Sequence, residues 1–246
     1  MGLSSNSVVH FTKDKESLKG ILAENFKIKY CREEIPREKK PLVLYVPMVS
    51  FCDIPLSQVK EHINAYGSYG IGLTREWAVR NRLNPVLYIQ NGSFFAESYH
   101  AAIKYFYSEK IDDLTQERFR AEERLLELFR YAKPYEGPLK RIGKATIPSY
   151  RFSDEREWRY APPATEGINF IYGAKAFDRD VAAESVAHLR LNFEPSDIKY
   201  IIINDDSEIS DFVRHLDDVK GANYSKRDVE IVTTRIITAE QIKTDF

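Results

Sequence analysis

The order of apolar and polar positions along the chain predicts short strands and helices that mix without a strict repeat. Alternating or continuous apolar runs predict strands at residues 8–11, 42–46, 48–51, 71–73, 86–89, 144–147, 153–160, 200–203 and 229–234, with Pro47 separating the second from the third. Apolar residues three or four apart predict helices at residues 16–24, 55–65, 74–80 and 207–216, and a helical insert at about 94–131. The mixture lacks the regular βαβ alternation of a doubly wound sheet, so we expect an α+β fold.

Composition narrows the class of protein. The 246 residues fit one domain, and 36 basic against 37 acidic side chains create no global field that would draw the chain onto nucleic acid or a membrane. The two cysteines and five histidines show no ligand-like spacing, so no zinc site is expected. The N-terminus resembles no secretory leader, and no apolar run approaches the length that spans a bilayer. We therefore expect a cytoplasmic protein.

The segment at residues 152–160 holds the most informative pair of side chains. In a strand, residues two apart share a face, so Glu155 and Glu157 should point the same way, with Arg159 beside them. Two adjacent carboxylates repel each other unless a cation or a ligand lies between them. One interpretation is a salt-bridge network with the arginines of the same segment, Arg151, Arg156 and Arg159. The other is general acid and base chemistry on a sugar.

Two further positions have both a functional and a structural interpretation. His10 closes the first predicted strand, where an imidazole could anchor two ribose hydroxyls or bond the local backbone. Tyr69 lies in the glycine-rich segment 67–73, which matches neither a Walker A loop nor the dinucleotide fingerprint. Its ring could stack on a planar ligand, or it could be half-buried in a turn that leads into a strand.

Other polar groups favour structural roles. Cys52 as a nucleophile would need a nearby base, so a buried thiol with Asp53 capping the next helix is the favoured interpretation. The alternating charges of residues 117–130 are typical of a solvated helix face or an interaction surface. The acids of residues 204–206 follow a buried strand and indicate an Asx turn rather than a metal site. No metal is expected.

Several of these motifs together resemble the AbiGi family of abortive-infection proteins, over essentially the whole chain. The residues that carry this resemblance are His10-Phe11-Thr12 with Leu18 and Ile21-Leu22, then residues 47–56, 66–73 and 155–159. The family is associated with bacterial phage defence and is described as an antitoxin.

A looser resemblance is to the ADP-ribosyltransferases, including the DarT group, which share an early histidine-containing strand and a late catalytic glutamate. This resemblance implies that His10, with Phe11 and Thr12 beside it, holds the ribose of the substrate NAD, and that Tyr69 stacks on the nicotinamide. It implies that Glu157 is catalytic and that Glu155 helps to engage the acceptor. It also implies a mixed-sheet transferase core interrupted by the helical insert.

Two hypotheses from different classes follow. The first is an NAD-dependent mono-ADP-ribosyltransferase-like effector of phage defence that modifies a nucleic-acid or protein acceptor. The second is a non-catalytic antitoxin or regulator that binds a partner toxin. A nuclease is disfavoured, because the sequence lacks an acidic cluster that would bind a metal.

Overall fold

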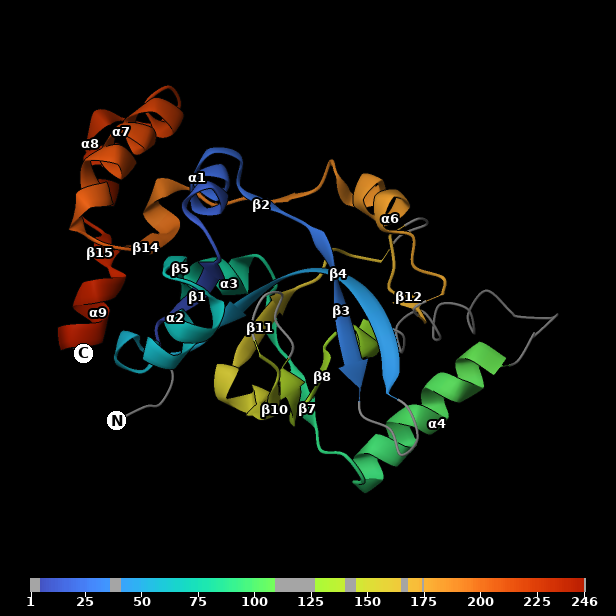
Figure 1. Cartoon of the computed structure of the whole chain (residues 1–246). Coiled ribbons are helices and arrows are strands. Elements are labelled where there is room, and N and C mark those ends of the chain that lie inside the picture. Colours follow the sequence, from blue (N-terminus) through green and yellow to red (C-terminus); the bar gives the residue numbers. More distant parts are fainter. Residues whose placement is uncertain are drawn as a thin grey trace. The chain divides into compact units, whose positions relative to one another are not determined.

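The computed structural model describes residues 5–35, 41–108, 127–139, 145–164, 168–173 and 175–245 (Figure 1). The chain divides into two compact units. Unit 1 comprises Met1–Ile28, Val49–Leu83 and Leu189–Phe246, and unit 2 comprises Lys29–Met48 and Asn84–His188. Strand β4, Leu42–Cys52, begins in unit 2 and ends in unit 1. The units share this strand, and each combines separate stretches of chain. A division into compact units does not test whether the chain folds as one domain, so the expectation of a single domain stays a prediction.

Unit 1 is built on a mixed sheet with the strand order β15-β14-β5-β1-β4. Its other strands are β1 Ser7–Thr12, β5 Tyr69–Thr74, β14 Ile198–Ile203 and β15 Ile236–Thr238. Strand β14 pairs with β15 in parallel and with β5 in antiparallel orientation, which makes the sheet mixed. A small antiparallel pair, β2 Phe26–Lys27 and β13 Arg190–Leu191, completes the strands of the unit. The predicted mixture of helices with a mixed sheet is confirmed.

The helices of unit 1 are α1 Lys15–Glu24, α2 Lys60–Tyr66, α3 Arg75–Arg80, α7 Ile209–Lys220, α8 Lys226–Thr233 and α9 Ala239–Asp245, with short 3-10 turns η1 Leu56–Gln58, η3 Pro195–Asp197 and η4 Asp206–Glu208. Three of these helices, α1, α3 and α8, begin at side-chain caps that the sequence supplies. The Asp14 side chain accepts from Ser17 N–H to cap α1, and Thr74 accepts from Trp77 N–H to cap α3. The helices predicted at 16–24 and 74–80 are therefore confirmed.

Three predictions in unit 1 need correction. Residues 229–234 lie in helix α8 or directly after it and form no strand, because Ser225 and Asp228 form a capping box and Val229 and Val232 bury one helical face. The helix predicted at 55–65 is divided into η1 and α2. Asp53 does not cap it, since its carboxylate accepts from Ser5 N–H at 2.9 Å and from Arg75 at 2.8 Å.

The polar end of β14 behaves as the sequence indicates. Asp205 accepts from Ser207 N–H at 3.0 Å and so makes the expected Asx-type turn. Unit 1 also contains an apolar cluster formed by Val9, Ile54, Val59, Ile63, Ile202, Ala239 and Ile242. These residues come from β1, β14 and the segments of α2 and α9, so the sheet and its helices share one core.

Unit 2 contains a long antiparallel ladder and several short strand pairs. Its strands are β3 Lys29–Ile35, β6 Asn84–Pro85, β7 Leu87–Ile89, β8 Ala132–Pro134, β9 Glu136–Leu139, β10 Ile147–Arg151, β11 Glu157–Tyr160 and β12 Ile171–Tyr172. Strand β3 pairs with β4 from Lys29↔Met48 to Ile35↔Leu42. Strand β4 is continuous through Pro47, which pairs with Tyr30, so the predicted break at this proline is wrong.

The described parts of the helical insert are α4, Phe94–Ser108, and residues 127–131, of which 127–129 are helical. Unit 2 also contains α6, Arg179–Val186. The middle of the insert, residues 109–126, lies outside the described residues, and so does most of the charged segment predicted at 117–130. Ala96 and Tyr99 of α4 pack into the core of unit 2 with residues of β3, β4, β7 and β8. Across the ranges that the structure describes, no helix is both long and apolar enough to cross a membrane.

Candidate functional site

The two glutamates predicted to share one strand lie in two different elements of unit 2. Residues Phe152–Glu155 form the 3-10 turn η2, and strand β11 starts only at Glu157. Between them, Arg156 adopts a left-handed conformation with φ of 47° and donates its N–H to the Ser153 carbonyl at 3.1 Å. The prediction of a continuous strand at 153–160 is therefore wrong, because this turn interrupts it.

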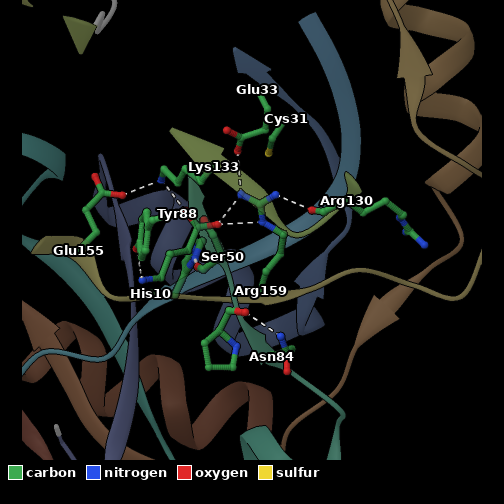
Figure 2. Close-up of polar contacts among 12 residues, drawn as sticks. His10, Cys31, Glu33, Ser50, Asn84, Tyr88, Arg130, Lys133, Glu155 and Arg159 are labelled. Carbon is green, nitrogen blue, oxygen red and sulfur yellow. Dashed lines mark hydrogen bonds and ion pairs between the residues drawn. The ribbon is translucent and has the colours of Figure 1, made fainter. Parts of the chain in front are cut away.

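Glu155 and Glu157 nevertheless meet at one cation, Lys133 of β8. Figure 2 shows the contact between Lys133 and Glu155. The Lys133 ammonium donates to Glu155 Oε2 at 2.6 Å and also to Glu157 Oε2. The same ammonium lies 5.2 Å from the centroid of the Phe152 ring. Lys133 thus bridges the two carboxyl groups and ties turn η2 to β8 and β11.

Arg159 neutralises the other side of Glu157. Its Nε donates to Glu157 Oε1 at 2.9 Å, and its Nη2 forms ion pairs with Glu157 at 2.7 Å and with Glu33 of β3 at 2.8 Å. Its Nη1 donates to the Arg130 carbonyl, at a distance of 2.5 Å. Figure 2 shows the contact between these two residues. Arg159 is fully buried, and Glu157 is only 4% exposed. Both carboxylate oxygens of Glu157 therefore accept hydrogen bonds from cationic side chains, Oε1 from Arg159 and Oε2 from Lys133.

This group of residues, Glu33, Lys133, Glu155, Glu157 and Arg159, is called the glutamate cluster below. It contains three carboxyl groups and two cations, so one carboxyl group lacks a full counter-charge. Burial would raise the pKa of Glu157, but Arg159 and Lys133 outweigh it and lower that pKa to about 2. Burial, then the negative charges of Glu157 and Glu33, raise the pKa of Glu155 to about 9. Glu155 therefore carries a proton near neutral pH, and Glu157 is ionised.

Backbone and ring contacts hold the cluster in place. The Glu157 N–H donates to the Tyr88 hydroxyl at 2.8 Å, and the Val86 N–H donates to the Glu157 carbonyl at 3.1 Å.

Cys31 lies beside the cluster. Burial raises the pKa of the Cys31 thiol to about 11, and the negative charge of Glu33 adds to the effect. Cys31 therefore stays a neutral thiol at physiological pH and is a poor nucleophile.

The residues predicted to bind NAD lie together in unit 1. His10, Phe11 and Thr12 belong to β1, and Thr12 pairs directly with Tyr69 of β5. Because residues two apart share a face and directly paired residues face the same side, His10, Thr12 and Tyr69 share one face of the sheet. Phe11 points to the other face, where its ring lies 6.3 Å from that of His62.

His10 and Tyr69 make polar contacts within the protein. His10 Nδ1 bonds the Ser50 carbonyl at 2.8 Å, and its ring packs against Phe26 and Phe51 at 5.3 and 5.7 Å. The Tyr69 hydroxyl donates to Glu208 at 2.9 Å. The contact of Tyr69 matches its half-buried interpretation, whereas His10 bonds the backbone of β4 and not the local backbone of its own strand end. A shared face is also what residues that bind one ligand require, so the NAD-binding roles stay predictions.

Sequence reasoning missed the residues that complete the glutamate cluster. Lys133 and Glu33 lie 24 and 126 positions away in sequence from the groups of β11 with which they pair. The only available signal was indirect, since buried paired carboxylates require cations. Among the described residues, no group of three or more His, Cys, Asp or Glu side chains could hold a metal ion.

Comparisons with known proteins place this chain in a family. Residues 24–204 match the family described as "Putative abortive phage resistance protein AbiGi, antitoxin". The chain is also 28% identical over 239 residues to the Abortive phage resistance protein AbiGi of Lactococcus lactis subsp. cremoris, covering 87% of this chain and 94% of that protein. No solved structure matches the chain significantly. The family match spans most of the chain, and the protein belongs to the AbiGi family of abortive phage resistance proteins.

Proposed function

We propose that this protein acts in abortive phage defence as an antitoxin that binds and restrains a partner toxin. The observation that carries this proposal is the family match over residues 24–204, whose description includes the word antitoxin. In this proposal the glutamate cluster has a structural role. Glu157 is buried and its two oxygens are bound by Lys133 and Arg159, which suits a group that stabilises unit 2.

Co-expression with the product of the neighbouring gene tests this function. Cells that express the neighbouring gene alone should stop growing, and the wild-type chain should restore growth and co-elute with the toxin. The matched variants are Glu155→Gln and Glu157→Gln, which keep side-chain shape while removing the titratable group. An antitoxin that retains its fold should protect cells in either form. Failure of the wild-type chain to bind or to protect would remove this proposal.

An NAD-dependent ADP-ribosyltransferase-like effector is the second candidate, and one observation favours it. Glu155 and Glu157 have pKa values of about 9 and about 2 and contact the same ammonium, so a protonated and an ionised carboxyl group lie close together. Such a split is typical of acid and base pairs in enzymes. In this candidate, Glu157 stabilises charge at the ribose, Glu155 engages a nucleic-acid or protein acceptor, and His10, Phe11, Thr12 and Tyr69 bind NAD.

Nicotinamide release from NAD separates the two candidates. The purified chain is incubated with NAD and with cell extract as a source of acceptors, and free nicotinamide and labelled products are measured. The enzyme predicts turnover that Glu157→Gln abolishes, and toxicity of the chain expressed alone. Retained turnover in Glu157→Gln would contradict the catalytic role of that residue, and the absence of turnover in wild type would remove this candidate.

A further inference from the structure

Two arginine side chains of unit 2 are fully buried, and their polar contacts differ. Arg159 is 0% exposed, and each of its side-chain nitrogens donates to an acceptor: Nε to Glu157, Nη2 to Glu33 and Nη1 to the Arg130 carbonyl. Arg130 is also 0% exposed, and its Nη1 donates to the two oxygens of Glu127 at 3.0 and 2.9 Å. Within the part of the chain that the structure describes, Nε and Nη2 of Arg130 are buried and have no acceptor.

The two nitrogens of Arg130 that lack an acceptor form one edge of the guanidinium. The Nε–H and one N–H of Nη2 point the same way, and this fork matches the two oxygens of a carboxylate or of a phosphate group. Buried donors nearly always have a partner, because an unsatisfied donor costs the full free energy of its desolvation. An unsatisfied fork on a fully buried arginine therefore points to an oxyanion as its partner.

The carboxylate of Glu127 does not occupy this fork. Both of its oxygens contact the single nitrogen Nη1. Glu127 lies three positions before Arg130 in the same turn, where the Arg130 N–H donates to the Glu127 carbonyl at 3.2 Å. Side chains three positions apart in a helical turn are neighbours, so this local ion pair follows from the sequence spacing. The fork needs an acceptor that this turn does not supply.

Partly exposed side chains lie close to the Arg130 guanidinium. The Glu127 side chain, in direct contact with Nη1, is 36% exposed, so the guanidinium lies beneath a carboxylate that reaches solvent. Tyr131 and Tyr160 are also partly exposed. Burial raises the pKa of both phenols, and the positive charge of Arg130 opposes the effect in each, which indicates that the guanidinium is near both hydroxyls. The fork is therefore buried but close to the surface of unit 2.

We propose that Arg130 anchors a binding site for a small oxyanion, a carboxylate or phosphate group whose two oxygens accept from Nε and Nη2. Glu127 is the acidic neighbour that competes with the bound anion for the charge of Arg130. The Arg130 carbonyl contacts Arg159, whereas its side chain extends away from that residue in Figure 2. The site is therefore distinct from the glutamate cluster, and it goes beyond the antitoxin function without depending on it.

Equilibrium dialysis of the purified chain against radiolabelled orthophosphate or acetate tests the proposal, with chloride keeping the ionic strength constant. We expect one anion to bind per chain, and the probe that binds more tightly shows whether the ligand group is a phosphate or a carboxylate. Arg130→Lys keeps the charge but removes the fork, so it should raise the dissociation constant by about tenfold or more. The matched control is Arg179→Lys at an exposed position of α6, which should change the constant by less than about twofold.

A second variant keeps the test valid even if Arg130→Lys does not fold. Glu127→Gln removes the competing carboxylate, so it should lower the dissociation constant of the anion by about threefold or more. Its control is Glu97→Gln, which removes the same charge at an exposed position of α4 and should change the constant by less than about twofold. A purely structural Arg130–Glu127 pair gives no reason for anion binding to tighten when Glu127 is replaced.

Three results would overturn the proposal. The first is that the wild-type chain binds neither anion. The second is that Arg130→Lys, shown by thermal unfolding to be folded, binds as tightly as wild type, which would place the anion elsewhere. The third is that Glu127→Gln binds no more tightly than Glu97→Gln. Because the assay contains neither a toxin nor NAD, each of these results leaves both candidate functions standing.

Discussion

Each glutamate of the buried pair performs a different electrostatic task. Glu157 is ionised between Lys133 and Arg159, and removing its charge leaves two buried cations without their counter-ion. Breaking a buried ion pair from one side typically costs about 3–5 kcal/mol of folding free energy. Glu155 holds a proton, so a neutral amide at that position resembles the native state.

We therefore expect Glu157→Gln to lower the free energy of unfolding by about 3 kcal/mol or more near neutral pH, and Glu155→Gln to change it by less than about 1 kcal/mol near pH 4.5, where Glu155 of the wild type is still about half protonated in the unfolded chain as well. Urea unfolding followed by circular dichroism measures both. A Glu155→Gln loss as large as that of Glu157→Gln would mean that Glu155 is ionised and paired in the folded protein.

The same assignment predicts how stability depends on pH. The pKa of Glu155 is raised from 4.5 to about 9, so its contribution is complete below about pH 4.5 and is lost as pH rises toward 9. Between pH 4.5 and pH 9, the free energy of unfolding of the wild type should fall by up to about 1.4 kcal/mol per pH unit relative to that of Glu155→Gln. Unfolding of both proteins at about pH 6 and about pH 9 gives the difference. Parallel pH profiles for the two proteins would rule out the raised pKa.

Glu157 acts in the opposite direction. Its pKa is lowered from 4.5 to about 2, so its contribution to the free energy of unfolding is present above pH 4.5 and is lost as pH falls toward 2.

Residue types alone could predict that the two carboxylates need a cation. They could not identify Lys133, because a contact across 24 positions is decided by strand pairing rather than by local sequence.

At the scale of elements, helix caps were more informative than β-propensity. Asp14 and Thr74 mark helix starts that the sequence predicts correctly, since capping is a local interaction. The Val- and Thr-rich residues 229–234 suggest a strand, yet the capping box of Ser225 and Asp228 starts a helix there. Propensity failed at this position because burial of Val229 and Val232 on one helical face outweighs it.

Close packing between strands accounts for one glycine of β5. A Cβ added at Gly72 would lie 2.8 Å from Tyr200 Cδ2, whereas a Cβ at Gly20 in α1 would meet no atom within 4 Å. We expect Gly72→Ala to destabilise the protein by about 1–3 kcal/mol and Gly20→Ala to stabilise it by about 0.5–1 kcal/mol. Thermal unfolding of the two variants should shift in opposite directions. A neutral Gly72→Ala would mean that Tyr200 moves aside at no cost.

For the whole molecule, strand β4 raises the question of whether the two units unfold together. Leu44 and Val46 of this strand are buried in the core of unit 2, and Phe51 of the same strand is buried in unit 1. A continuous strand that loses its packing at one end transmits that loss if the units form one cooperative domain. The sequence predicted a single domain from length, and length alone cannot test cooperativity.

The two tryptophans provide a direct test, because Trp77 lies in unit 1 and Trp158 in unit 2. Trp77→Phe and Trp158→Phe each leave a single reporter, and Leu44→Ala is introduced into both backgrounds. Loss of this buried leucine should cost about 2–5 kcal/mol. In a single cooperative domain, the urea midpoints reported by Trp77 and by Trp158 fall by the same amount. A fall seen only by Trp158 would make unit 2 an independent domain, and strand β4 would then be a covalent link that carries no folding cooperativity.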